Sequence, residues 1–527
     1  MRILWSSNIP FAPTGYGMTT ASCVHWLRRL GHDVAVLAFW GLKGTKVDWG
    51  EVPIYPNNTD DWGVSQAPAY FKDFNADIFL TLVDVWVLGG MPLDIPWVPW
   101  LPIDHDPPPK IVTDILQKHP AIIQAITQSR FGVEKLQEIG INAEYIPPAI
   151  NCNLFQPNQM WRDEARDKYN WTKKFVVGCV ATNHNERKNW TASFKAFAEF
   201  EHRHKGETVM YCHTKVFDQR GIDLNALRLA LGIGGTTFFP SQDSLEIGIE
   251  QETMARTYNV MDVHLLPSKG EGFGMPIVES QACGVPNIIT KCTSHAELLG
   301  GGWYVPVYDK HRVWTSQASW QFECDPDDIL EQLEKAFAAW KDGSIQIEKD
   351  KARDFALQFD DNVVFPELWV PVLDRIEKKL KAPRTNLEGV QEWKLLFIPK
   401  TCQPRKVLDL GCGVTTPYKP YLEGMGKYYP VDKRNENGNG VNQEILVHDA
   451  HELPFKDNEF GFVWCCEVLE HCISPEKVVA EAKRVGKHGV MIFSTPQNPF
   501  FKHDPDHRIV RGVSYTTLTS GDGCVTW

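Results

Sequence analysis

The chain has 527 residues, enough for about three or four domains at roughly 150 residues each. Hydrophobic residues make up 43% and charged residues 23% of it, a globular composition that excludes a disordered, collagen-like or coiled-coil protein. The net charge of −12 disfavours a general nucleic-acid coat, which needs Lys and Arg against phosphates, but it leaves room for a local basic site.

Residues 1–155 alternate short apolar runs with a helical pattern and predict a first α/β domain. A strand is expected at residues 2–6, a Pro/Gly-rich loop at 10–17, a helix at 19–30 and a strand at 34–39. Strand, helix and strand at this spacing are typical of a parallel βαβ unit. Further strands are expected at residues 78–83, 97–103 and 122–127.

Residues 156–380 continue the alternation and predict a second doubly wound domain. Its expected strands lie at residues 174–180, 207–213, 260–266 and 287–290. Its expected helices lie at residues 190–202, 276–283, 326–340 and 365–380. Because parallel sheets place ligands at the carboxyl ends of their strands, the loops after these strands are the candidate functional regions.

Residues 381–389 are polar and contain proline, which indicates a linker over residues 381–400, and residues 401–527 predict a third βαβ domain. An apolar run at residues 406–413 ends in glycines, and a helix is expected at 475–485. Further strands are expected at residues 428–431, 462–465 and 490–494.

Two features argue against export and against a membrane span. The N-terminus reaches polar residues after three apolar ones, too few for a signal peptide. The most apolar stretch, residues 78–103, is interrupted by two aspartates and four prolines. The 13 cysteines show no C-x-x-C spacing, which favours reduced thiols over a zinc site or a disulfide framework. We therefore expect a soluble cytoplasmic protein.

The most informative motif runs from the expected strand at 260–266 into a glycine-rich loop and then into a helix with Pro276 at its first position. Its loop glycines are Gly270, Gly272 and Gly274. Glycine backbone N–H groups and a helix N-terminus at the end of a strand predict an anion pocket. Two carboxylates flank it, Glu271 in the loop and Glu279 in the helix.

This Glu-x7-Glu arrangement resembles the signature of glycosyltransferase family 4, a family of GT-B enzymes, and the resemblance spans most of residues 1–380. It implies two Rossmann-like domains that face a cleft, and a nucleotide-sugar donor bound mainly by the second. It also implies retention of anomeric configuration without a metal ion. By position, Glu271 is expected near the donor sugar and Glu279 at the ribose, while Gly272, Phe273 and Gly274 contact the donor.

Three further sites follow from the same resemblance. Gly15 and Gly17 correspond to a glycine-rich turn near the donor phosphate or acceptor, although a simple tight turn fits equally well. His105 resembles the family's cleft histidine, where an imidazole can donate a hydrogen bond to a sugar hydroxyl; the alternative is a surface-loop histidine. Arg187 and Lys188 are expected to neutralise the leaving diphosphate, the alternative being a solvated pair.

The position of the arginine departs from the family pattern. The family places an Arg a few residues before the lysine, where this chain has Thr182 and Asn183. Lys188 is therefore the stronger assignment, with Arg187 as a possible substitute, and the departure leaves catalytic efficiency or donor identity open.

A second constellation begins where the run at 406–413 turns at Gly411 and Gly413, with Asp432 about 20 residues further on. The pattern resembles class I S-adenosylmethionine-dependent methyltransferases more than a NAD-binding Rossmann unit, which lacks the later matching segments. By that resemblance Asp409, Gly411 and Gly413 surround the methionine part of the cofactor, and Asp432 binds its ribose. Its adenine is expected against Asp449 and Ala450.

The third domain is short at its C-terminal end. The family covers the last parallel strand with an antiparallel pair, and residues 515–519 and 524–527 are the segments available for such a hairpin. Without it, that strand would be an exposed edge. His471 fits a structural position at a helix start better than a catalytic base.

The predicted fold class is therefore α/β: a GT-B pair of Rossmann-like domains followed by a class I methyltransferase-like domain that is short at its C-terminus. The predicted function is a retaining glycosyltransferase that moves a sugar from a nucleotide-diphosphate donor to an acceptor hydroxyl, fused to an S-adenosylmethionine-dependent methyltransferase. The alternatives are a transferase with a non-catalytic docking module, or a related GT-B sugar-nucleotide enzyme such as an epimerase. The expected partners are a nucleotide sugar and a glycan or other hydroxyl acceptor, with nucleic acid disfavoured by charge.

Overall fold

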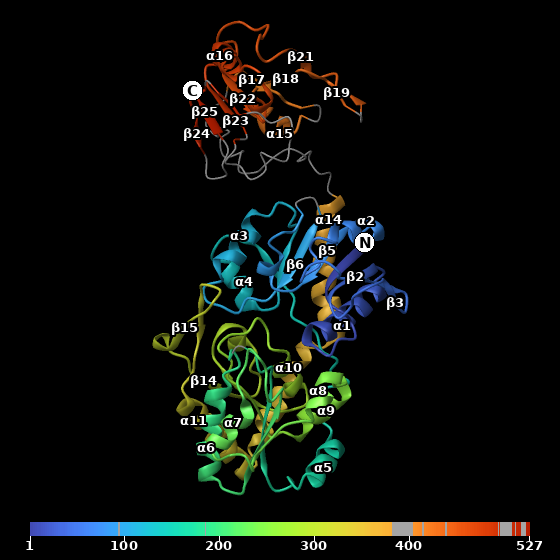
Figure 1. The fold of residues 1–527 in the computed structure, drawn as a ribbon, viewed down its shortest axis with the longest axis vertical. Coiled ribbons are helices and arrows are strands. Elements are labelled where there is room, and N and C mark those ends of the chain that lie inside the picture. The colour runs from blue at the N-terminus through green and yellow to red at the C-terminus, as the bar shows by residue number, and fades with distance from the viewer. Residues whose placement is uncertain are drawn as a thin grey trace. The chain divides into compact units, whose positions relative to one another are not determined.

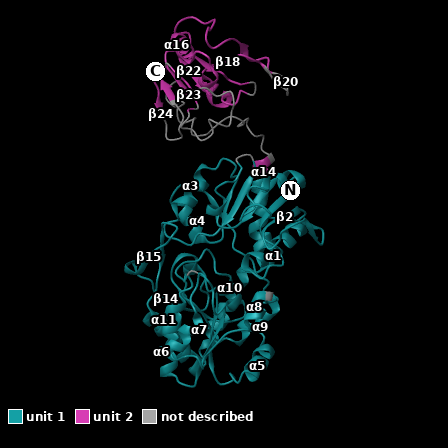
Figure 2. Cartoon of the chain, in the orientation of Figure 1, with its two compact units in different colours: residues 1–377 teal, residues 378–527 magenta. Residues whose placement is uncertain are grey.

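The computed structural model describes residues 1–92, 95–184, 186–381, 404–413, 416–437, 440–493, 495, 509–511, 513–517 and 523–527. They form two compact units, Met1–Glu377 and Lys378–Trp527 (Figure 2). Each unit has its own parallel sheets and hydrophobic cores, as the predicted α/β class requires.

The first sheet of the larger unit has the strand order β3-β4-β2-β1-β5-β6-β7-β8 (Figure 1). All neighbours pair in parallel except β3, which is antiparallel to β4. The strands are β1 (Arg2–Asn8), β2 (Asp33–Trp40), β3 (Val47–Trp49), β4 (Val52–Pro56), β5 (Ile78–Leu82), β6 (Trp97–Leu101), β7 (Ala125–Thr127) and β8 (Ala143–Tyr145). The connecting helices are α1 (Gly15–Arg29), α2 (Ala67–Phe74), η1 (Val85–Leu88), α3 (Lys110–Lys118) and α4 (Arg130–Gln137).

Helix α1 begins earlier than the sequence predicts. Thr14 caps it, because its Oγ1 accepts a hydrogen bond from the Gly17 N–H at 3.0 Å. Gly15 and Gly17 therefore lie in the first helical turn and not in a loop. A Cβ atom on Gly17 would lie 2.4 Å from the carbonyl oxygen of Ala12, so this position requires glycine, whereas Gly15 has open space around it.

The second sheet of this unit has the order β11-β10-β9-β12-β13-β14, with neighbours in parallel. Its strands are β9 (Phe175–Val180), β10 (Thr208–His213), β11 (Thr237–Phe238), β12 (Val263–Leu266), β13 (Asn287–Thr290) and β14 (Gly302–Val305). Its helices are α5 (Gln159–Lys168), α6 (Trp190–Arg203), α7 (Leu224–Ala230), α8 (Gln242–Ile247), α9 (Gln251–Val260), α10 (Met275–Ala282), η2 (Thr293–Glu297), η3 (Asp309–His311), α11 (Pro326–Asp342), α12 (Ile345–Ala356) and η4 (Leu357–Phe359).

After the second sheet the chain returns to the first one. The returning segments are α13 (Asp361–Val364), η5 (Phe365–Trp369) and α14 (Val370–Lys381). The fully buried Trp369 ring lies 5.1 Å from the ring of Trp100 in β6 and 6.3 Å from that of Trp5 in β1, measured between centroids. These indoles anchor the end of the unit in the core under the first sheet. The domain limits at residues 155 and 380 stay predictions.

A hairpin that the sequence analysis did not predict bridges the two halves of the larger unit. It consists of β15 (Arg312–Trp314) and β16 (Trp320–Phe322), paired antiparallel. The Asp106 N–H donates to the Trp320 carbonyl at 3.1 Å, and Ser319 Oγ donates to the Pro107 carbonyl at 2.5 Å. We call residues 309–323 the bridging hairpin.

The smaller unit contains a sheet of order β21-β18-β17-β22-β23-β25-β24. Its strands are β17 (Lys406–Leu410), β18 (Lys427–Asp432), β21 (Leu446–Val447), β22 (Phe462–Cys466), β23 (Gly489–Phe493), β24 (Thr516–Thr517) and β25 (Gly523–Thr526). The remaining elements are the strand pair β19 (Glu436–Asn437) and β20 (Gly440–Val441) and the helices α15 (Lys419–Leu422), η7 (Leu469–His471) and α16 (Pro475–Val485).

The hairpin expected near the C-terminus is confirmed. Strand β25 pairs antiparallel with β23, and β24 pairs antiparallel with β25, so the last parallel strand is not an edge. Within the described residues, no helix has the length and apolar character that crossing a bilayer requires.

Candidate active sites

The second sheet reverses its strand order between β9 and β12, and charged side chains meet at that point. Arg187 and Lys188 follow β9, and Glu271 follows β12. Arg187 Nη1 lies 2.6 Å from one oxygen of Glu271, and Lys188 Nζ donates to the other. Glu271 is only 5% exposed, so one buried carboxylate holds two cations. Three residues predicted from the sequence thus meet at the carboxyl ends of two neighbouring parallel strands, where such sheets bind ligands.

The two cations determine the charge state of this carboxylate. Burial by itself raises the pKa of Glu271, but the charges of Arg187 and Lys188 outweigh it and hold the pKa well below its usual range. The pKa of Lys188 is lowered to about 8, first by burial and then by repulsion from Arg187, against the attraction of Glu271. Glu271 is therefore ionised at neutral pH, and Lys188 is the group most easily discharged.

The glycine loop before α10 packs closely against the first half of the unit. A Cβ atom on Gly270 would lie 2.3 Å from the Asp104 carbonyl oxygen, and one on Gly272 would lie 2.0 Å from Pro102 Cβ. Phe273 is buried behind this contact. Gly274 takes a positive φ of 125° as the residue before α10. Residues 270–273 are buried, and only residues 274–276 remain partly exposed at the start of the helix. Of the predicted anion pocket, the start of the helix is therefore the part that solvent reaches.

Hydroxyl groups from the turn after β13 hold the backbone of this loop. The Glu271 N–H donates to Thr293 Oγ1 at 3.0 Å. Ser294 Oγ lies within donating distance of two loop carbonyls, those of Glu271 at 2.8 Å and Phe273 at 2.6 Å. The loop is therefore rigidly placed before any ligand binds.

Glu279 occupies a different environment from Glu271. It is also 5% exposed, but its partner is the neutral Tyr258, whose hydroxyl donates to it at 2.7 Å. Burial raises the pKa of Glu279 to about 7, and the Tyr258 hydrogen bond only partly opposes this. Glu279 lines a cavity of about 210 Å³ together with residues of α1, among them His25 and Trp26, and with Met275 at the start of α10. A sugar ring with hydroxyl groups fits such a mixed lining.

His105 lies at the contact between the two halves and is 2% exposed. Its Nδ1 is 2.6 Å from an Asp104 carboxylate oxygen, and its Nε2 is 2.9 Å from Thr315 Oγ1 in the bridging hairpin. Both ring nitrogens therefore have protein partners. A hydrogen bond from this imidazole to a sugar requires the hairpin to release Nε2.

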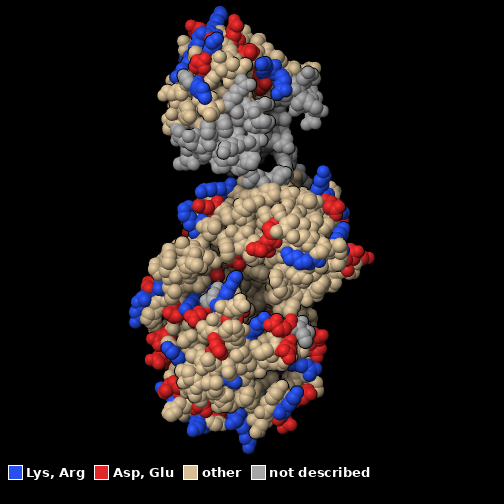
Figure 3. Space-filling model, in the orientation of Figure 1, with Lys and Arg blue, Asp and Glu red and all other residues tan. Residues whose placement is uncertain are grey.

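The carboxyl ends of β1 and β5 carry two residues that the sequence analysis missed, Tyr16 and Asp84. Burial and the nearby charge of Asp104 together raise the pKa of Asp84 to about 6, against the opposing charge of Arg187. Burial likewise raises the pKa of Tyr16 well above its usual value, and Asp84 adds to this. Asp84 directly follows the expected strand at 78–83. Its position at the carboxyl end of a parallel strand was therefore the signal that could have identified it. The space-filling view shows a hollow between the two halves with acidic and basic side chains at its walls (Figure 3).

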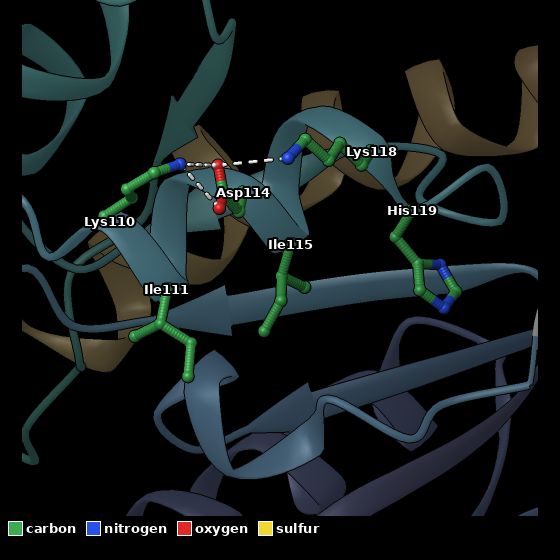
Figure 4. A pocket seen from close by; sticks show the side chains of 6 residues that line it. All are labelled: Lys110, Ile111, Asp114, Ile115, Lys118 and His119. Atoms are coloured by element: carbon green, nitrogen blue, oxygen red, sulfur yellow. Dashed lines mark hydrogen bonds and ion pairs between the residues drawn. The ribbon is translucent and has the colours of Figure 1, made fainter. Parts of the chain in front are cut away.

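A larger open hollow of about 550 Å³ lies elsewhere, on the outer face of α3 (Figure 4). Ile111, Ile115 and His119 point to one side of the helix, while Lys110 and Lys118 both pair with Asp114. None of the residues predicted from the sequence lines this hollow.

In the smaller unit the predicted residues gather at the carboxyl ends of β17 and β18. The Gly413 N–H donates to Asp432 Oδ2 at 2.9 Å, and the Tyr428 hydroxyl donates to Asp409 Oδ2 at 2.7 Å. Asp409 is 1% exposed, and burial raises its pKa to about 7 against the opposing Tyr428 hydrogen bond. Gly411 and Gly413 both have positive φ, and a Cβ atom on Gly411 would lie 2.1 Å from a Val468 methyl carbon.

These residues fit the cofactor that the resemblance implies. Among the residues that the structure describes, none has an atom within 4 Å of where a Cβ atom of Gly413 would be, so a ligand can approach the backbone there. Within the described part of the unit, no Lys or Arg forms an ion pair with Asp409 or Asp432, which suits a ligand with a sulfonium and an ammonium charge. Asp449 follows β21, the strand next to β18, and its Oδ1 lies 2.6 Å from His451 Nδ1. Ala450 packs against the core.

Two family models match the chain. Residues 174–318 match "Glycosyl transferases group 1", and residues 408–494 match "Methyltransferase domain". A probable sucrose-phosphate synthase of Thermosipho melanesiensis is 24% identical over 33% of this chain and 38% of its own length. A probable chloroplastic tocopherol O-methyltransferase of Oryza sativa is 31% identical over 17% of this chain and 28% of its own length. The chain thus spans less than half the length of the curated relatives that it matches.

Solved structures resemble the larger unit in fold. A sucrose-phosphate synthase of Thermosynechococcus elongatus is 14% identical, with a TM-score of 0.55, and covers 71% of this chain and 100% of its own. Anabaena HepE in complex with UDP-glucose is 15% identical, with a TM-score of 0.54 and the same coverage. The chain therefore combines a GT-B fold that carries a glycosyl transferases group 1 segment with a methyltransferase domain.

Proposed function

We propose that residues 1–380 transfer a sugar from a nucleotide-diphosphate donor to an acceptor hydroxyl, with retention of configuration and without a required metal ion. The observation that carries the proposal is the pair of cations on one buried carboxylate, Glu271, at the reversal point of the second sheet. Two fixed positive charges in a water-poor site stabilise the charge that develops on a leaving diphosphate. Retention rests on the Glu-x7-Glu resemblance.

Each residue has a proposed role in this reaction. Arg187 and Lys188 bind the diphosphate, which takes over part of their pairing with Glu271. Glu271 then contacts the donor sugar, and Glu279 accepts hydrogen bonds from the ribose in the cavity beside α1. The backbone at Gly272, Phe273 and Gly274 and the α1 turn with Gly15 and Gly17 contact the donor, and His105 lies near the reacting sugar.

The test is a screen of UDP- and GDP-sugars for nucleotide release, beginning with UDP-glucose because HepE binds it. We expect Glu271→Gln to lose release while the exposed control Glu252→Gln keeps it. Release from Glu271→Gln at the wild-type rate would contradict the site assignment. A sugar epimerised without transfer would support the alternative, a related GT-B sugar-nucleotide enzyme.

We further propose that the smaller unit is a methyltransferase that uses S-adenosylmethionine. Asp409, Gly411 and Gly413 would hold the methionine part of the cofactor, Asp432 its ribose, and Asp449 and Ala450 its adenine. When bound, the cofactor supplies an electrophilic methyl group. Because fusion raises the local concentration of each site's product, we propose the same glycan or its acceptor as the methyl acceptor.

Calorimetry with S-adenosylmethionine distinguishes this function from a docking module. We expect saturable binding that Asp432→Ala abolishes and that Asp457→Ala, an exposed control near the end of α16, leaves intact. Absence of binding to the wild-type chain would favour the docking module.

A further inference from the structure

The first sheet has its own reversal point, which the proposed donor site does not use. Its strand order runs outward from β1 through β2 and β4 on one side, and from β5 through β6, β7 and β8 on the other. Ligands of open α/β sheets bind in the crevice at such a point, beyond the carboxyl ends of the strands. The polar side chains there include Tyr16, in the first turn of α1, and Asp84, directly after β5.

The two reversal points face the same space, because Arg187 of the second sheet lies beside Asp104, which follows β6, the neighbour of β5 in the first sheet. Arg187 lowers the pKa of both Asp84 and Tyr16, and Glu271 raises that of Tyr16. Arg187 Nη1 also lies 3.8 Å from an Asp104 carboxylate oxygen. The reversal point of the first sheet is therefore opposite the proposed diphosphate-binding group.

Asp84 is available to a ligand. It is partly exposed, and within the described residues no side chain donates a hydrogen bond to its carboxylate. The nearby cations are already engaged, because Arg187 and Lys188 pair with Glu271. Asp104 is also engaged, by His105.

The distribution of charge across this space is asymmetric. The wall from the second sheet carries the two cations, while the wall from the first sheet carries the carboxylates of Asp84 and Asp104. A ligand group against the first wall must donate hydrogen bonds and must not be anionic, since a phosphate or carboxylate there meets like charge. Sugar hydroxyls are such donors, and the protonated Tyr16 hydroxyl beside them can donate to a sugar oxygen.

We propose that Asp84, with Tyr16, binds the hydroxyl groups of a neutral sugar acceptor and excludes phosphorylated sugars from that position. This inference rests on the proposed glycosyltransferase function. It assigns to the same active space a specificity-determining residue and an acceptor class: an uncharged glycoside whose hydroxyls donate to the Asp84 carboxylate.

The test measures acceptor-stimulated nucleotide release by the full chain from UDP-glucose and from GDP-mannose. The probes are the methyl glycosides of glucose, mannose and galactose and the 6-phosphates of the same glycosides. We expect at least one neutral glycoside to stimulate release and its 6-phosphate to be at least tenfold less effective. Asp84→Ala is expected to raise KM for the neutral glycoside at least tenfold and Asp84→Asn to raise it less, because the amide oxygen still accepts a hydrogen bond.

UDP affinity measured by calorimetry on the same variants separates acceptor binding from damage to the fold. We expect Asp84→Ala to change it less than twofold, and the exposed control Asp48→Asn to change neither quantity. An unchanged KM in Asp84→Ala, a 6-phosphate that works better than its neutral glycoside, or no stimulation by any neutral glycoside would overturn this assignment alone. If the wild-type chain releases nucleotide from neither donor and binds no UDP, the proposed function fails and this assignment fails with it.

Discussion

Two buried carboxylates at strand ends, Glu271 in the larger unit and Asp409 in the smaller, have opposite electrostatics. Glu271 holds two cations and its pKa is held well below the usual range, whereas Asp409 has a neutral Tyr428 partner and burial raises its pKa to about 7. Both are at least nineteen-twentieths buried. On the proposed functions, the same topology would serve ligands of opposite charge: fixed cations suit a diphosphate, and carboxylates without a cationic partner suit a sulfonium cofactor.

Removing the cations would leave Glu271, like Asp409, buried without a charged partner. This change should have the largest effect on activity. We expect Arg187→Ala and Lys188→Ala each to lower nucleotide release by about 10²- to 10³-fold, because each removes one charge that stabilises the leaving group. The control is Lys195→Ala, an exposed lysine on α6. Steady-state kinetics at saturating donor measure the loss, and near-wild-type kcat in both variants would remove the basis of the comparison.

The contributions of Asp409 and Glu271 to stability should depend on pH in opposite directions. Asp409 has a folded pKa above its unfolded value, so its contribution to stability is full below about pH 4 and is lost as pH rises through about 7, by about 4 kcal/mol at most. Glu271 has a lowered folded pKa, so its contribution is present above about pH 4.5 and is lost only as pH falls through the folded value. Hydrogen exchange followed from pH 3 to 8 measures each unit separately, with the Glu271 contribution changing at the acidic end and that of Asp409 changing up to about pH 7. Asp409→Asn should flatten the response of the smaller unit, and an unchanged slope in that variant would contradict the assignment.

The loop at Gly272 and the turn at Gly235 should differ in how well they tolerate an added methyl group. Gly272 touches Pro102 of the opposite half, so Gly272→Ala should separate the halves and slow transfer by up to about 10²-fold, the cost of a 1 Å misplacement. Gly235→Ala, where nothing lies within 4 Å, is the matched control. Small-angle scattering and nucleotide release measure the two effects; a compact and fully active Gly272→Ala chain would show that the contact is dispensable.

The smallest expected effect concerns the Tyr428 hydroxyl. Tyr428→Phe removes the hydrogen bond to Asp409 and should lower the free energy of unfolding of the smaller unit by about 1 kcal/mol at pH 8, where the carboxyl is ionised. The loss should shrink at pH 5, because a protonated Asp409 depends less on a donor. Native-state hydrogen exchange of the β17 and β22 amides at the two pH values measures it. An equal loss at both pH values would argue that Tyr428 acts through packing alone.

Local sequence signals predicted much of the sheet architecture and part of the site. Glu271, Arg187 and Lys188 meet because each follows a parallel strand, and those strands prove to be neighbours. The contact of His105 with Thr315 was not predictable, because Thr315 lies 210 residues further along the chain in a hairpin without a strong strand pattern. The start of α1 was misplaced because two glycines resembled a loop, while the Thr14 cap overrides their low helix propensity.

The sequence alone determined which residue types stand at which strand ends, since hydrophobic periodicity and glycine spacing are local properties of the chain. Only the tertiary structure decided the partners and protonation of those residues: that Glu271 pairs with two cations while Glu279 accepts from the neutral Tyr258, and that the glycine loop closes against Pro102. The physical reason is that burial and charge act through space. The pKa of a carboxyl group is set by the side chains that the fold places around it, and most of these are distant in sequence.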